Sequence, residues 1–117
     1  MLKVEAIIRP ERINQVTSAL EGAGCTGFHY VNVTGQGRQR GVEVFVGRSG
    51  QTVTRSAVPK TIVTTVIPDD LLETVIEAII GAARSPGGGY MGDGKIFVSA
   101  VSEVIRVSTG ERGEVAI

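Results

Sequence analysis

The sequence predicts an α+β fold in which two β-α-β units share one four-stranded antiparallel sheet with both helices on the same face. Strand-like patterns over residues 2–8 and 28–34 flank a helical pattern, and the same order recurs in the second half of the chain. The two units have similar lengths, which is typical of a double β-α-β arrangement. With 117 residues, the chain is expected to form one domain over residues 1–117 with its own core.

The first unit alternates apolar and polar side chains over residues 2–8, as a half-buried strand does. Pro10 then opens a helical pattern, and Gly24 supplies its stop signal. The apolar positions of this helix recur at steps of three and four residues: Ile13, Val16, Leu20 and Ala23. Residues 28–34 are rich in aromatic and β-branched side chains, which favours a second strand.

The second unit begins with a β-branched run over residues 61–67. Pro68 and two aspartates start the second helix, because acidic side chains in a first turn favour the helix dipole. Its expected apolar face comprises Leu72, Val75, Ile76, Ile79 and Ile80. A glycine-rich loop follows over residues 84–94, and residues 96–107 are predicted to form the last strand or a strand pair. The result is a ferredoxin-like arrangement.

One face of this sheet has no predicted layer to cover it. Val4, Ile62, Thr64 and Val66 are expected on that face, between polar neighbours. Self-association is the simplest way to bury it.

The balanced charge, the single cysteine and the short apolar runs argue against several classes of protein. Twelve basic and twelve acidic residues cancel, which argues against nucleic-acid binding. The single cysteine, Cys25, suits a reducing compartment and is interpreted as a buried or half-buried thiol. We find no signal-peptide pattern and no apolar run near the roughly 20 residues that span a bilayer, so we expect a cytoplasmic protein without direct membrane insertion.

The most informative segment is Gly92-Asp93-Gly94-Lys95-Ile96-Phe97-Val98. Glycines let backbone N–H groups approach a bound anion, and Lys95 adds a positive charge beside them. The pattern therefore predicts a phosphate-binding turn. The alternative is a turn whose glycines only permit tight geometry.

The segment between Gly35 and about Ala57 has no steady periodicity apart from the alternation over residues 42–46. Such a length inside a small domain usually indicates a binding or switching element. The alternative is a hairpin that makes few contacts.

Taken together, these features resemble the PII signal-transduction family over essentially the whole chain. The matching segments are Ala6-Ile7-Ile8-Arg9-Pro10, Gly35-Gln36-Gly37-Arg38-Gln39-Arg40-Gly41, Pro59-Lys60, Pro68-Asp69-Asp70, Gly92-Asp93-Gly94-Lys95-Ile96-Phe97-Val98, Val104-Ile105-Arg106 and Thr109-Gly110-Glu111. The resemblance implies a homotrimer of ferredoxin-like subunits that bind ATP or ADP in the clefts between neighbours. It also implies a T-loop over about residues 36–58 that docks to target proteins, a B-loop over about 84–95 and a C-terminal segment over about 104–117.

The resemblance also implies the residues of the site. The phosphates would be held by Gly92, Asp93, Gly94, Lys95 and Arg106, with Arg38 approaching from the neighbouring subunit. The adenine and ribose would be lined by Gly27, Phe28, His29, Thr64 and Val66. A co-effector, 2-oxoglutarate beside magnesium-bound ATP, would be held by Arg9, Gly37, Gln39, Gly41 and Lys60.

The chain departs from the family pattern in several places. No tyrosine stands at the tip of the T-loop, residues 47–54, and the B-loop carries extra residues within 86–91. Ser108 replaces a second arginine that is common in the family, so ADP or AMP is expected to compete better with ATP than in typical members. His29 and Thr64 alter the adenine end. These departures favour a specialised branch, and one such branch is linked to carbon uptake and answers to bicarbonate.

We therefore predict a regulatory sensor in nitrogen or carbon metabolism rather than an enzyme, acting on a transporter, enzyme or regulator through its T-loop. No catalytic residues and no metal site of its own are expected, although Mg²⁺ could accompany ATP. Two alternatives remain: a slow ATP-hydrolysing enzyme of the same fold, and a structural trimer whose nucleotide cleft has decayed.

Overall fold

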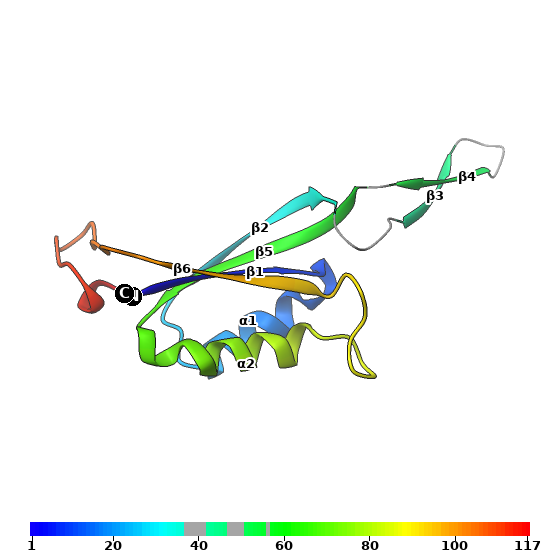
Figure 1. The fold of residues 1–117 in the computed structure, drawn as a ribbon. Helices are drawn as coiled ribbons and strands as arrows, with labels where there is room; N and C mark the ends of the chain where they lie inside the picture. The colour runs from blue at the N-terminus through cyan, green and yellow to red at the C-terminus, as the bar shows by residue number, and fades with distance from the viewer. Residues whose placement is uncertain (37–41, 47–50, 56) are drawn as a thin grey trace.

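Two β-α-β units form the main body of the chain in the computed structural model (Figure 1). The structure describes residues 1–36, 42–46, 51–55 and 57–117. The first unit contains β1 (Leu2–Ile8), a 3₁₀ turn (Pro10–Arg12), α1 (Ile13–Gly22) and β2 (Phe28–Gly35). The second contains β5 (Val58–Ile67), a 3₁₀ turn (Asp69–Leu71), α2 (Leu72–Ala83) and β6 (Gly94–Ala100).

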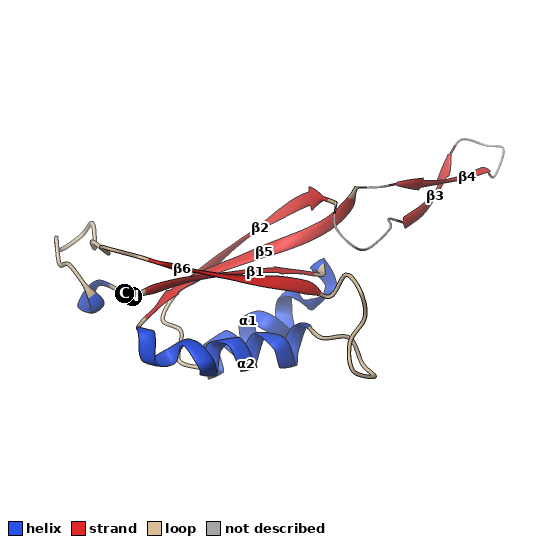
Figure 2. Ribbon diagram, viewed as in Figure 1, coloured by secondary structure: helices blue, strands red, loops and turns tan. Residues whose placement is uncertain are grey.

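The four long strands form one antiparallel sheet in the order β2-β5-β1-β6. Both helices lie on the same face of this sheet (Figure 2). The predicted α+β, ferredoxin-like fold is therefore confirmed. Between β2 and β5, the strands β3 (Val42–Val46) and β4 (Gln51–Arg55) pair with each other in a separate two-stranded antiparallel sheet.

The core lies between the helices and the covered face of the sheet. Its buried residues are Val4, Ala6, Ile8, Val16, Leu20, Val63, Ile67, Val75, Ile79 and Ala83. Alternate residues of β1 and β5 contribute to it, as the period of two in a strand requires. The first helix ends as predicted, with Gly24 in the left-handed region at φ 94°.

The positions predicted for two apolar residues, Val4 and Ile80, were wrong. Val4 lies in the core under the helices and not on the open face, whereas Ile62, Thr64 and Val66 do lie on the open face. A run of apolar residues at the end of β1 hides its alternation, so the sequence did not decide which set faces the helices. Ile80 is 38% exposed and lines an open pocket between α2 and β6, together with Ile76 and Ile96.

The ends of two strands also differ from the predicted ones, and sheet pairing explains both. β6 ends at Ala100 rather than near Val107, because Ala100 lies opposite Leu2, where its neighbour in the sheet, β1, begins. Beyond that point the described chain has a 3₁₀ turn (Glu114–Ala116) and an isolated bridge between Ile105 and Arg112. β5 starts earlier than predicted, at Val58, because β2 continues far enough to pair Gly35 with it.

Candidate functional site

The glycine-rich loop between α2 and β6 is built on left-handed glycines. Gly87, Gly88, Gly89 and Gly92 have φ values between 87° and 96°, and Gly94 has a φ of 135°. Gly94 also lies so close to β1 that a Cβ atom would be 1.9 Å from the carbonyl oxygen of Ile7. The loop can therefore join the sheet only through a residue without a side chain.

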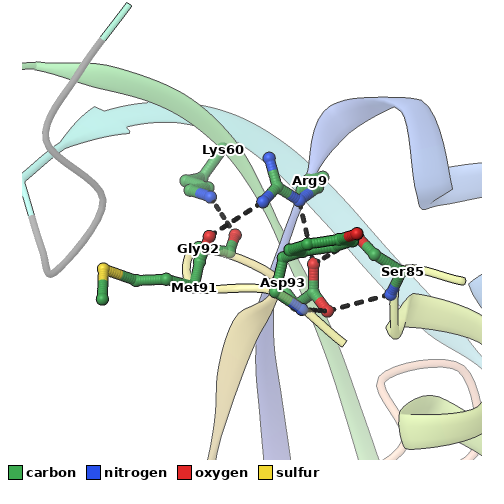
Figure 3. Close-up of polar contacts among 7 residues, drawn as sticks. Arg9, Lys60, Ser85, Met91, Gly92 and Asp93 are labelled. Atoms are coloured by element: carbon green, nitrogen blue, oxygen red, sulfur yellow. Dashed lines mark hydrogen bonds and ion pairs between the residues drawn. The ribbon is translucent and has the colours of Figure 1, made fainter. Parts of the chain in front are cut away.

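Asp93 lies at the centre of this loop (Figure 3). Its Oδ1 accepts hydrogen bonds from the Ser85 hydroxyl at 2.5 Å and from Arg9 Nε at 3.0 Å. Its Oδ2 accepts from the backbone N–H groups of Ser85 and Tyr90, each at 2.9 Å. Burial alone would raise the pKa of Asp93, but these hydrogen bonds outweigh it and hold the pKa well below its ordinary value. The carboxylate is thus a charged anchor for both ends of the loop.

Two cations, Lys60 of β5 and Arg9 just beyond the end of β1, hold the same loop by its backbone (Figure 3). Arg9 Nη2 donates to the carbonyl oxygen of Met91 at 2.9 Å, and Lys60 Nζ donates to that of Gly92. Burial lowers the pKa of Lys60, and the charge of Arg9 adds to this effect, while Glu11 and Asp93 act in the opposite direction. The end of β1, strand β5 and the loop are therefore fastened to one another.

A pocket of about 690 Å³ lies between this loop and the ends of β2 and β5. Its apolar lining includes Ile7, Val33, Val58, Met91 and Phe97. Its polar lining includes Lys60, Lys95 and the glycines of the loop. An anion with an apolar body suits this combination of charge and apolar wall.

The residues predicted for adenine and ribose lie towards the other end of the sheet. Phe28 and His29 begin β2, opposite Thr65 and Thr64 of β5. The Thr65 hydroxyl donates to the carbonyl oxygen of Gly27 at 2.7 Å, which fixes the entry into β2. Val66 lies further along β5, opposite Lys3.

Arg106 lies beyond β6, in the C-terminal segment. Its backbone N–H donates to the carbonyl oxygen of Glu111 at 2.9 Å, and its Nη2 donates to that of Val115 at 3.0 Å. Its Nη1 lies 3.9 Å from a carboxylate oxygen of Glu111. The side chain remains partly exposed.

One chain does not bring all the predicted site residues together. Gly94 lies opposite Ile8 at one end of β1, and Ala100 lies opposite Leu2 at the other. The six residue steps between Gly94 and Ala100 span roughly 20 Å. The predicted residues thus form two groups: Arg9, Lys60, Gly92, Asp93, Gly94 and Lys95 near the first end, and Gly27, Phe28, His29, Thr64, Val66 and Arg106 towards the second. Gly37, Arg38, Gln39 and Gly41 lie outside the described residues.

Sequence reasoning missed the part that Ser85 and the backbone of Tyr90 play in holding Asp93. The only signal in the sequence was an acidic residue between two glycines. This pattern does not identify the groups that donate hydrogen bonds to the carboxylate. Within the described parts of the chain, no three His, Cys, Asp or Glu side chains are grouped as metal ligands. The helices among these residues are also too short or too polar to cross a bilayer.

The fold and the loop define a ferredoxin-like domain that presents an anchored glycine turn beside a basic pocket. The model of the nitrogen regulatory protein P-II family matches residues 1–111, so the chain belongs to this family of signalling proteins. It is 43% identical over its full length to nitrogen regulatory protein P-II 2 of Methanothermobacter thermautotrophicus, covering 97% of that protein. It is 40% identical, over the full length of both chains, to nitrogen regulatory protein P-II 1 of Escherichia coli K12.

A solved structure shows the same likeness in three dimensions. The crystal structure of Arabidopsis thaliana PII bound to citrate superposes with a TM-score of 0.75 at 43% sequence identity. The match covers 98% of this chain and 87% of that one.

Proposed function

We propose that this protein is a homotrimeric sensor of adenine nucleotides that binds ADP, ATP or AMP in clefts between subunits. Each cleft takes the glycine turn and Lys95 from one subunit and Arg106 with the adenine-lining residues from its neighbour. Ligand occupancy biases the segment 36–58, which contacts a partner protein. The identity of the partner, whether transporter, enzyme or regulator, stays open.

The observation that carries this proposal is the separation of the two residue groups along β6. Lys95 and Arg106 both suit a polyphosphate, one as a point charge and the other as a planar fork. Lys95 lies near the start of β6, whereas Arg106 lies six residues beyond its end, so the two are not expected to meet at one ligand within a single subunit. A cleft formed between two subunits would bring Lys95 of one subunit and Arg106 of the other to the same ligand.

The open face of the sheet supports self-association. Val31, which is 53% exposed, lies opposite Ile62, and Ile62 lies opposite Ile7 on the same face. Phe97, which is 50% exposed, lies on this face of β6 opposite Glu5. A row of apolar side chains across a sheet face gains free energy when a second surface removes it from water. Three copies that pack through these faces would also bring the Lys95 group of one subunit next to the Arg106 group of its neighbour.

The network around Asp93 defines what this residue contributes to phosphate binding. Its carboxylate is held by Arg9 and Ser85, and its backbone N–H donates to the carbonyl oxygen of Tyr90 at 3.1 Å. Asp93 therefore acts by shaping the turn, while Lys95 and the glycines face the phosphates.

Arg9 and Lys60 are the described residues proposed for a co-effector, with 2-oxoglutarate and bicarbonate as the two candidates. Both side chains already donate to carbonyl oxygens of the glycine loop. A bound carboxylate therefore has to share or replace these contacts, which would couple the co-effector to the position of the loop. Mg²⁺ would accompany ATP as its counter-ion.

A subunit-mixing experiment tests the shared cleft. Lys95→Ala and Arg106→Ala are each expected to lower nucleotide affinity at least tenfold in isothermal titration calorimetry, because each loses a charge-assisted contact. When the two variants are mixed and reassembled in equal amounts, about a quarter of the clefts combine an intact Lys95 with an intact Arg106. Recovery of that fraction of high-affinity sites supports the proposal. No recovery in a confirmed mixed oligomer would refute it.

Nucleotide binding and turnover are separated by one further measurement. A phosphate-release assay with Mg-ATP is expected to show no turnover above the buffer blank, since a sensor only needs to bind. Absence of any nucleotide binding by the wild-type protein would leave the glycine turn as a structural turn only.

A further inference from the structure

Two large side chains stand exposed on the glycine loop, beside the pocket. Tyr90 is 69% exposed and Met91 is 60% exposed. Both line the 690 Å³ pocket together with Lys60, Lys95 and Phe97.

The backbone that carries them is firmly held. The N–H of Tyr90 donates to Asp93 Oδ2 at 2.9 Å, and the N–H of Asp93 donates back to the carbonyl oxygen of Tyr90 at 3.1 Å. The carbonyl oxygen of Met91 accepts from Arg9 at 2.9 Å. Both Tyr90 and Met91 therefore leave the loop from fixed backbone positions.

The preceding turn has to be glycine to reach this position. Gly89 has a φ of 96°, and a Cβ there would lie 3.1 Å from Arg84 Cγ and 3.2 Å from Asp93 Oδ2. The backbone N–H of Gly89 donates to the carbonyl oxygen of Ser85 at 3.1 Å, which closes the turn. The turn therefore presents two large side chains at the pocket from fixed positions, and a ligand that covered their apolar surface would gain free energy.

We propose that Tyr90 and Met91 are ligand-contacting residues that set nucleotide affinity in this protein, with Tyr90 packing against the nucleoside. This inference rests on the proposed function. The ligand is a nucleoside di- or triphosphate, whose phosphates meet Lys95 and whose apolar part completes the wall formed by Phe97 and Met91. Tyr90 contributes through its ring, so its hydroxyl is dispensable.

The chain offers a direct spectroscopic test, because it contains no tryptophan and only two tyrosines. In a Tyr30→Phe variant, Tyr90 is the sole tyrosine, and its emission reports only on this loop. Quenching by acrylamide is measured with and without saturating ADP, and free N-acetyltyrosinamide corrects for absorption by the nucleotide. We expect ADP to protect Tyr90 from quenching.

Affinities are measured in parallel by calorimetry. Tyr90→Ala is expected to weaken the binding of ADP and of ATP equally, by roughly tenfold. This is the effect expected for loss of an aromatic packing contact to a nucleoside. Tyr90→Phe should stay within about twofold of wild type. Met91→Ala, expected to give a smaller loss, serves as the second variant if Tyr90→Ala folds poorly.

Several outcomes would overturn the inference. It fails if Tyr90→Ala binds ADP as wild type does, if ADP leaves acrylamide quenching unchanged, or if Tyr90→Phe loses as much affinity as Tyr90→Ala. It also fails if Tyr90→Ala dissociates the oligomer in sedimentation, because the ring would then be a subunit contact. Lys95→Ala separates the two proposals: if it weakens binding while Tyr90→Ala does not, the shared nucleotide cleft stands and the role of Tyr90 does not.

Discussion

Asp93 shows how much of the loop depends on one carboxylate. Donors from Arg9, Ser85 and Tyr90 converge on its two oxygens, and only 17% of its side chain is exposed. An acidic group beside a proposed phosphate site would repel the ligand if it were free. Because it is surrounded by donors, it instead draws the loop into a closed turn.

Replacing Asp93 with asparagine tests this role. The amide is neutral, and its NH₂ group cannot accept the hydrogen bonds that Oδ2 receives. We expect Asp93→Asn to lower the free energy of unfolding at pH 7 by about 2–3 kcal/mol, measured by urea denaturation. Ser18→Ala, an exposed change in α1, is a control that should be nearly neutral.

The same pair of proteins gives a pH dependence. The pKa of Asp93 is depressed in the folded state, so its stabilisation is complete above the ordinary aspartate value of about 3.9 and is lost as the pH falls below it. The difference in unfolding free energy between wild type and Asp93→Asn should thus be constant above about pH 5 and shrink at lower pH. A difference that does not change down to the acid limit of folding would contradict this assignment.

Ser108 lies two residues beyond Arg106, in an exposed turn of the C-terminal segment. Restoring a guanidinium there should add a charge-assisted contact to the terminal phosphate. We expect Ser108→Arg to raise ATP affinity about tenfold relative to ADP, measured by calorimetry. Ser108→Gln, which adds length without charge, should leave the ratio unchanged. An unchanged ratio for both variants would place Ser108 away from the phosphates.

At the level of elements, sequence analysis correctly predicted the features that depend on local sequence pattern. Strands β1 and β2, the start of α1 at its proline turn and the order of the two β-α-β units were all predicted correctly. The end of β6 was not, because it depends on where its partner β1 begins. The ion pair between Arg9 and Asp93 joins residues 84 positions apart, so no local pattern could indicate it. The glycine turn was recognised, but its anchoring was not.

Gly94, where the loop joins β6, is a position that tolerates no side chain. A Cβ at this position would lie 1.9 Å from a backbone oxygen of β1, and the backbone cannot yield without breaking the sheet. We expect Gly94→Ala to destabilise the protein by about 3 kcal/mol or more in urea denaturation. Gly81→Ala is a matched control inside α2, where nothing lies within 4 Å of the added carbon. It should stabilise the protein by about 1 kcal/mol. Equal effects of the two changes would contradict the close approach.

At the level of the whole molecule, the two faces of the sheet differ in what covers them. The helices bury one face, while the other presents Val31, Ile62 and Phe97. Neighbouring residues on β2 make this contrast testable, because Tyr30 is 55% exposed and lies on the helix side, whereas Val31 is 53% exposed and lies on the open side.

We expect Val31→Glu to shift the oligomer towards monomer in analytical ultracentrifugation, because a charge would be buried between subunits. Tyr30→Glu, of similar exposure and on the opposite face, should leave the mass unchanged. Dissociation by Tyr30→Glu alone would place the interface on the helical layer instead.

Strand β6 has one more consequence for a closed ring of three subunits. In the proposed trimer, its first residue would contribute to one cleft, and the segment that continues from its last residue would contribute to the next. Each subunit would then connect two ligands, and a change in the shape of one cleft would move a strand that also contributes to the next. Binding at the three sites is then expected to be cooperative, because the second and third ligands meet subunits already displaced by the first.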